Sequence, residues 1–192
     1  VAARSGVTLS TAGFNTDYRT RSAAVEAPFA LQGAGLRGRN IPIGYEDAYR
    51  KSLPADYAPT DLVLLPKEIR YCGQAVYLRQ EAAESAVRMF NDAARQGLTL
   101  QVVSAFRDIA HQRRLFASSG GGNVAKPGHS EHMLGTTMDL TNSSKYLFKR
   151  SFADTAEGRW LRQNAWRYGW KATVMSSSGS RGHNDEPWHL RY

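Results

Sequence analysis

Two histidines and one aspartate are spaced so that they can share a catalytic centre. His132 and Asp139 lie seven residues apart in the segment SEHMLGTTMDL, and Gly135 between them can supply a turn that brings imidazole and carboxylate together. His189, in the segment EPWHLRY, can reach the same point from a neighbouring strand. Two imidazoles and one carboxylate are a familiar ligand set for a catalytic zinc ion, with a fourth position left for water. The pattern is therefore compatible with a zinc site, and ordinary structural roles for the three residues remain the alternative.

Glu186 precedes His189 by three residues and is suited to act as a base. A carboxylate near a zinc site can take a proton from water as the water attacks a carbonyl group. Residues three apart in a flat strand point to opposite faces, so we expect the backbone to bend at Pro187. A surface turn before a last strand is the alternative interpretation, in which Trp188 fills the core. His183 is the substitute ligand if His189 is not used.

Three further polar residues can contact a substrate. Arg107 lies where an apolar strand is expected to end and a helix to begin, and from there a guanidinium can hold a carboxylate with two hydrogen bonds. Gln112, one turn into that helix, and Ser130, in a glycine-rich loop, can add neutral hydrogen bonds. Arg107 as an ordinary surface cation remains the alternative.

The elements that must position these residues mix helices and strands without a repeating strand-helix-strand order. Apolar periodicity and capping residues predict helices at 78–96, 108–116 and 154–168. Alternation and turn residues predict strands within 57–66, 98–106, 136–141, 170–175 and 187–192. In 136–141, Met138 and Leu140 should face the core and turn Asp139 to the other face. We therefore expect an α+β fold with a small antiparallel sheet and flanking helices.

Composition limits the classes of partner. The chain has 25 Lys and Arg against 17 Asp and Glu, a formal charge of +8, which suits nucleic acid, anionic lipid or a phosphate-rich cell wall. No helix-turn-helix or RNA-binding pattern accompanies the charge, so we expect no nucleic-acid partner. No apolar run approaches the roughly 18–20 residues that span a bilayer. The chain starts at Val1, so a signal or anchor can lie outside this sequence. Cys72, the single cysteine, is expected to be a small buried thiol.

The length of 192 residues suits one domain with a substantial core. Residues 1–54 are rich in Gly, Ser, Thr and Arg and show little periodicity, so we expect a mostly irregular N-terminal arm. Residues 55–192 carry the motifs and the periodic segments, so we expect them to form the folded domain that contains the candidate zinc site.

Three segments in order, SAFRDIAHQ, SEHMLGTTMDL and EPWHLRY, resemble the zinc D-alanyl-D-alanine carboxypeptidases of the VanY type. That group shares a fold with lysostaphin-like peptidases and the signalling domain of hedgehog proteins. The resemblance covers about residues 55–192. The chain departs from the family pattern in reading AFRD for a GYRS-like run, and in reading TTM before Asp139 where small residues are usual. These departures leave substrate preference open.

The resemblance implies a role for each residue. Zn²⁺ would be held by His132, Asp139 and His189. Glu186 would serve as general base and then as general acid to the leaving amine, and Arg107 would hold the substrate or polarise the scissile carbonyl group. Substrate contacts would come from Ser130 and Gln112, with Trp188 as a further candidate.

The resemblance implies a zinc carboxypeptidase that trims the C-terminal D-alanine from peptidoglycan stem peptides, in the periplasm or at the cell wall. Both a pentapeptide substrate (D,D-cleavage) and a tetrapeptide substrate (L,D-cleavage) are compatible with the motifs. A peptidoglycan endopeptidase on the same scaffold, or a zinc-binding interaction domain without catalysis, is the alternative. We expect a monomer.

Overall fold

The computed structural model describes residues 52–120, 124–172 and 186–192. In these residues a four-stranded antiparallel sheet has the order β3-β4-β6-β5. Its strands are β3 (Gln101–Ser104), β4 (Thr137–Thr141), β5 (Lys171–Ala172) and β6 (His189–Arg191). A second antiparallel pair consists of β1 (Leu62–Leu64) and β2 (Tyr77–Arg79). His183, the second half of the strand expected at 170–175 and nearly all of the expected N-terminal arm lie outside the described residues.

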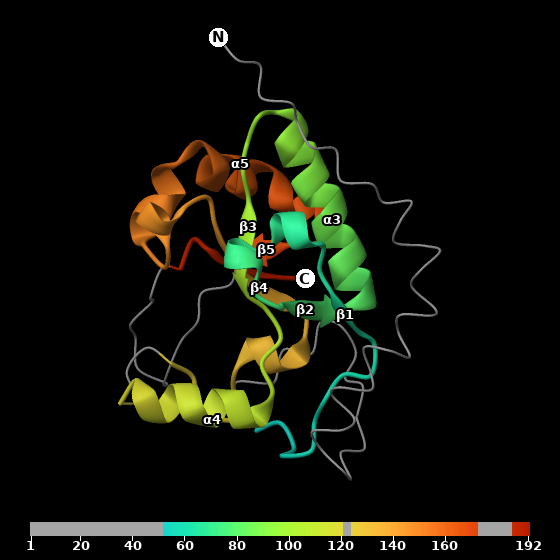
Figure 1. Ribbon diagram of the computed structural model, residues 1–192, viewed down its shortest axis with the longest axis vertical. Coiled ribbons are helices and arrows are strands. Elements are labelled where there is room, and N and C mark those ends of the chain that lie inside the picture. Colours follow the sequence, from blue (N-terminus) through green and yellow to red (C-terminus); the bar gives the residue numbers. More distant parts are fainter. Residues whose placement is uncertain (1–51, 121–123, 173–185) are drawn as a thin grey trace.

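In the described part of the chain, three α-helices surround the strands. In the view of Figure 1, α3 (Gln80–Arg95) runs along the right side, α5 (Ala156–Asn164) lies at the top and α4 (Ile109–Ser118) at the bottom. Short 3-10 helices connect the elements: η2 (Lys67–Ile69), η3 (Tyr71–Gly73), η4 (Glu131–Leu134), η5 (Ser144–Tyr146), η6 (Arg150–Asp154) and η7 (Ala165–Tyr168). The α+β prediction with a small antiparallel sheet is confirmed.

The helix expected at 78–96 begins two residues later than predicted. Leu78 belongs to β2 and is opposite Val63 of β1, because cross-strand pairing there takes precedence over helix propensity. The helix ends as expected, with Gly97 in the left-handed region at φ 74°. Its apolar face, which includes Ala86 and Phe90, is buried in the main core.

Capping is confirmed at one helix and differs at another. The Asp108 carboxylate accepts a hydrogen bond of 2.6 Å from the His111 backbone N–H and so caps α4. At α5 the cap is Thr155, not the expected Asp154, because the Thr155 hydroxyl accepts from the backbone N–H of Gly158 at 3.0 Å. The last turn of the helix expected to end at 168 is the 3-10 helix η7.

Strand β4 lies in the middle of the molecule and is buried on both faces. Met138 and Leu140 enter the hydrophobic core, as the alternation predicted. Asp139 points to the opposite face and is also buried. The expectation of a buried Cys72 is wrong: its side chain is exposed, in a residue with φ 50° inside η3.

A small second cluster supports the segment before β4. Leu53 and Tyr57 pack with Met133 and Leu134 of η4, and the Leu53 N–H donates to the Gly128 carbonyl at 2.8 Å. The packed structure thus includes Leu53, just before the domain boundary expected at residue 55.

Gly135 ends η4 with φ 71°, and a β-carbon added to it would lie 3.0 Å from both Arg79 Cγ and Leu62 Cδ2. We expect Gly135→Ala to lower the free energy of unfolding, measured by urea titration, by about 1–2 kcal/mol for the left-handed backbone and by about 1–3 kcal/mol more for overpacking. Gly97→Ala is the matched control, because Gly97 has φ 74° and no heavy atom within 4 Å of the place that an added β-carbon would take. Equal losses in the two variants would contradict the crowding argument.

Candidate metal centre

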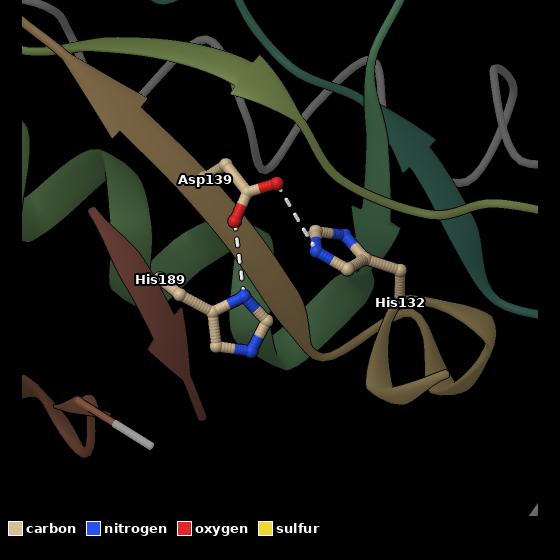
Figure 2. A group of neighbouring side chains, drawn as sticks. All are labelled: His132, Asp139 and His189. Carbon is tan, nitrogen blue, oxygen red and sulfur yellow. Dashed lines mark hydrogen bonds and ion pairs between the residues drawn. The ribbon is translucent and has the colours of Figure 1, made fainter. Parts of the chain in front are cut away.

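Three buried side chains from separate elements meet at one point. His132 comes from η4, Asp139 from β4 and His189 from β6, and Figure 2 shows them pointing toward one another. Asp139 Oδ2 lies 3.2 Å from His132 Nε2, and Asp139 Oδ1 lies 2.9 Å from His189 Nδ1. One possible ligand atom from each residue lies within 4.8 Å of the other two. The structure therefore brings together the three residues that the sequence singled out as a metal set.

Strand register explains how residues fifty positions apart meet. Asp139 and His189 are direct partners across the antiparallel β4–β6 pair. Directly opposite residues in such a pair have side chains on the same face with β-carbons about 4.5–5.5 Å apart. His132 reaches this face because the left-handed turn at Gly135 reverses the chain between η4 and β4.

The His132 ring is held with a defined nitrogen toward the site. Its Nδ1 lies 2.8 Å from the Ala105 carbonyl oxygen, which can only accept a hydrogen bond. Nδ1 therefore carries the hydrogen and Nε2 offers a lone pair toward Asp139. A backbone carbonyl that fixes the tautomer in this way is typical of metal-binding histidines.

The electrostatics of the three groups differ. Burial, followed by the positive charge of Arg107, lowers the pKa of His132 to about 4, so this ring is neutral near pH 7. Burial also disfavours the charged form of His189, but its hydrogen bonds to Asp139 and Glu131 outweigh that effect and raise its pKa to about 9. Burial opposes ionisation of Asp139, yet interactions with His132 and His189 hold its pKa well below the usual range.

The donor set fits a zinc ion. Two imidazole nitrogens and one carboxylate oxygen are ligands that zinc accepts at tetrahedral sites, and three protein ligands leave one position for water or substrate. An isolated carboxylate as buried as Asp139, at 6% exposure, needs a cation or hydrogen-bond donors nearby. A divalent ion would supply that counter-charge.

Glu186 lies beside the three residues because the backbone bends where expected. Pro187 and Trp188 form a turn, and the His189 N–H donates to the Glu186 carbonyl at 3.0 Å. The half-buried Glu186 carboxylate lines the same cavity of about 790 Å³ as the three buried residues. Burial raises its pKa, which makes the ionised carboxylate a better proton acceptor.

Arg107 also lines this cavity, at the end of β3. Its Nη2 donates to the Ser130 hydroxyl at 3.4 Å, and its buried Nε has no hydrogen-bond partner among the described residues. Burial lowers its pKa, while the negative charges of Asp139 and Glu186 oppose that shift. The guanidinium thus offers hydrogen bonds to an acceptor that enters the cavity.

The three expected substrate contacts occupy different places. Trp188 lines the cavity, with its ring edge-to-face against Phe148 at 6.1 Å between centroids. Ser130 and Gln112 are fully buried and are not among the lining residues. Gln112 instead donates to the Ala125 carbonyl at 2.7 Å, so it holds a wall segment in place. Direct substrate contact by Ser130 and Gln112 stays a prediction.

Glu131 was not predicted from the sequence. Its side chain is 1% exposed and is hydrogen-bonded to His189 and Arg191. The available signal was the alternation in the last strand, which places His189 and Arg191 on one face. A cation such as Arg191, largely buried beside His189, needs an acidic partner, and Glu131 is next to His132 in the sequence.

This chain is similar to known carboxypeptidases. The family model described as VanY, D-alanyl-D-alanine carboxypeptidase, matches residues 75–192. YodJ of Bacillus subtilis (strain 168), a carboxypeptidase by name, is 35% identical over 153 residues, which are 73% of this chain and 56% of YodJ. A D-alanyl-D-alanine carboxypeptidase of Enterococcus faecium is 33% identical over 119 residues, covering 61% of this chain and 38% of that protein. The chain thus spans about half or less of the length of these two relatives.

Solved structures share the fold. The LdcB LD-carboxypeptidase aligns with a TM-score of 0.64 and 34% identity over 73% of this chain and 72% of that one. A VanY D,D-pentapeptidase in complex with Zn(II) aligns with a TM-score of 0.51 and 22% identity, over 74% of this chain and 83% of that one.

The pKa of His189 gives the metal-free protein a pH-dependent stability. The folded-state pKa of about 9 lies above the unfolded value of about 6.5, so the stabilisation is complete below pH 6.5 and is lost as the pH rises toward 9. We expect urea titrations with a chelator present to show a falling free energy of unfolding across this window. His189→Gln should remove the fall. A wild-type stability that stays level or increases with pH would contradict the assignment.

Proposed function

The chain belongs to the VanY family of D-alanyl-D-alanine carboxypeptidases, and we propose that it is a zinc-dependent enzyme that removes the C-terminal D-alanine from peptidoglycan stem peptides. The observation that carries the proposal is the convergence of His132, Asp139 and His189, with Glu186 lining the same cavity. The Zn(II) complex of the VanY pentapeptidase, which has the same fold, supports the choice of metal.

In the proposed mechanism, His132 and His189, through the ring nitrogens nearest Asp139, and the Asp139 carboxylate would hold the zinc ion. When bound, zinc lowers the pKa of water toward about 7 and polarises a carbonyl group. Glu186 takes the proton of the attacking water at a carboxylate oxygen. It then delivers this proton to the nitrogen of the leaving D-alanine, so the carboxylate is regenerated at the end of each cycle.

Arg107 acts on the anionic parts of the substrate. A C-terminal carboxylate, or the oxygen of the scissile carbonyl as negative charge develops on it, can accept hydrogen bonds from the guanidinium. The Ser130 hydroxyl and the cavity wall keep the guanidinium in place. A carboxypeptidase needs such a cation, because its substrate ends in a negative charge.

Apolar residues line part of the cavity and suit a peptide with aliphatic side chains. These residues are Leu115, Val124, Leu147, Phe148 and Trp188. Phe148 is 49% exposed and contacts Trp188 edge-to-face, so the free part of its ring is available to a substrate. We propose that Phe148 and Trp188 together bind the stem peptide beside the scissile bond.

The place of action follows from the substrate, because peptidoglycan lies outside the cytoplasm; we therefore propose periplasmic or cell-wall action. None of the helices that the structure describes is long and apolar enough to cross a membrane. We propose that the peptidase domain corresponds to residues 55–192 extended by the packed Leu53.

Muropeptide digestion tests the function directly. We expect zinc-loaded protein to release one alanine from tetrapeptide or pentapeptide stems, incubated side by side and analysed by mass spectrometry. Glu186→Gln should lower kcat by about 10²–10⁴ fold because the proton acceptor is lost, while zinc content stays near one ion per chain. Cleavage inside the stem would indicate an endopeptidase. Zinc binding without cleavage of either stem would indicate an interaction domain.

Phe148→Ala tests the apolar wall. Loss of the ring should raise KM for the stem peptide by about three- to tenfold, which corresponds to less than the free energy of burying a whole aromatic side chain. The value of kcat should change little, and Phe148→Tyr should retain the wild-type KM. A fall in kcat at constant KM would place Phe148 in the chemical step and contradict the proposed wall.

A further inference from the structure

Glu131 connects the metal centre to a largely buried cation, Arg191. Its carboxylate uses one oxygen for each neighbour: Oε2 lies 2.8 Å from His189 Nε2, and Oε1 accepts from Arg191 Nη1 at 3.1 Å. Both Glu131 and Arg191 are poorly accessible, with side-chain exposures of 1% and 10%. Because a buried charge is costly unless it is paired, Arg191 gives Glu131 the counter-charge that the site requires.

The arrangement depends on the backbone of two elements. His189 and Arg191 are two apart on β6, so both side chains lie on one face of the strand. On η4, Glu131 and His132 are neighbours. His132 contacts Asp139, whereas Glu131 contacts the side of the His189 ring that faces away from Asp139.

A hydrogen bond at this remote nitrogen decides what the other nitrogen can do. A neutral imidazole has one N–H and one lone pair, and an ionised carboxylate can only accept. With Glu131 accepting from Nε2–H, the lone pair of His189 lies on Nδ1, the nitrogen nearest Asp139. The Ala105 carbonyl fixes His132 in the opposite sense, with the lone pair on Nε2. Each ring is thus tied at the nitrogen away from the site.

We propose that Glu131 is a positioning residue for the metal, which holds His189 with Nε2 as the hydrogen-bearing nitrogen so that Nδ1 binds zinc, while Arg191 balances the charge of the carboxylate. The proposal rests on the zinc site of the proposed function. Loss of an outer hydrogen bond to a metal-binding histidine weakens metal affinity by about 10–100 fold. A carboxylate that only stabilised the core would lower folding stability without changing affinity.

Zinc affinity measured by chelator competition separates these roles. We expect Glu131→Ala to raise the zinc dissociation constant by about 10–100 fold. Glu131→Gln keeps an acceptor for Nε2–H and should weaken binding less. Asp61→Asn is the matched control, because it weakens a largely buried ion pair of 2.8 Å, between Asp61 and Arg79, in which neither residue belongs to the metal set. The control should bind zinc as the wild type does.

The wild-type protein provides a second readout that does not depend on a variant folding. Long-range proton–nitrogen NMR of the zinc-loaded protein should show the hydrogen of His189 on Nε2. A hydrogen on Nδ1, or an affinity of Glu131→Ala within twofold of the wild type, would overturn the proposal. If the wild type binds no zinc, or His189→Ala binds it equally well, the proposed function fails instead, so the two failures are distinguishable.

Discussion

The structure depends on the interaction of one buried carboxylate with the two imidazoles on either side of it. Asp139 is 6% exposed and has a histidine at each oxygen. Such a group is stable in the interior only with donors or a cation close by. The direct pairing of Asp139 with His189 across the sheet places one imidazole beside the carboxylate, and the turn at Gly135 places the second there by returning His132 to the same face. The sheet, the turn and η4 therefore act together to place two imidazoles beside the buried carboxylate.

Charges around this centre are arranged in layers. Arg107 and Glu186 line the cavity and are open to a substrate, whereas Glu131 and Arg191 lie behind His189 and are buried. Arg107 and Glu186 can change their interactions during a reaction. Arg107 has an Nε without a hydrogen-bond partner among the described residues, and Glu186 is partly exposed. The buried pair is fixed by its own contacts. A catalytic metal site requires such a division, with fixed residues that support the ligands and adaptable residues that face the substrate.

Much of this could be predicted from the sequence, because the strongest signals are local. The alternation of Met138 and Leu140 placed Asp139 on the correct face, and Pro187 marked the bend that brings Glu186 to the site. The failures have tertiary causes. Leu78 is a strand residue because β1 pairs with it, and Cys72 is exposed because η3 turns sharply there. Glu131 was missed because its partners come from 58 and 60 residues away, a separation that no local pattern shows.

The order of the strands in the sheet affects when the metal-binding face forms during folding. Strand β6 lies between β4 and β5, although it follows both in the chain. Its contacts with β4 and η4 are long-range, and contacts of this kind form slowly because a long loop must first be closed. The metal-binding face is therefore incomplete in any intermediate that lacks the inserted strand. Partly folded chains would be unable to hold an ion, because the three residues of the metal centre come together only in the finished sheet.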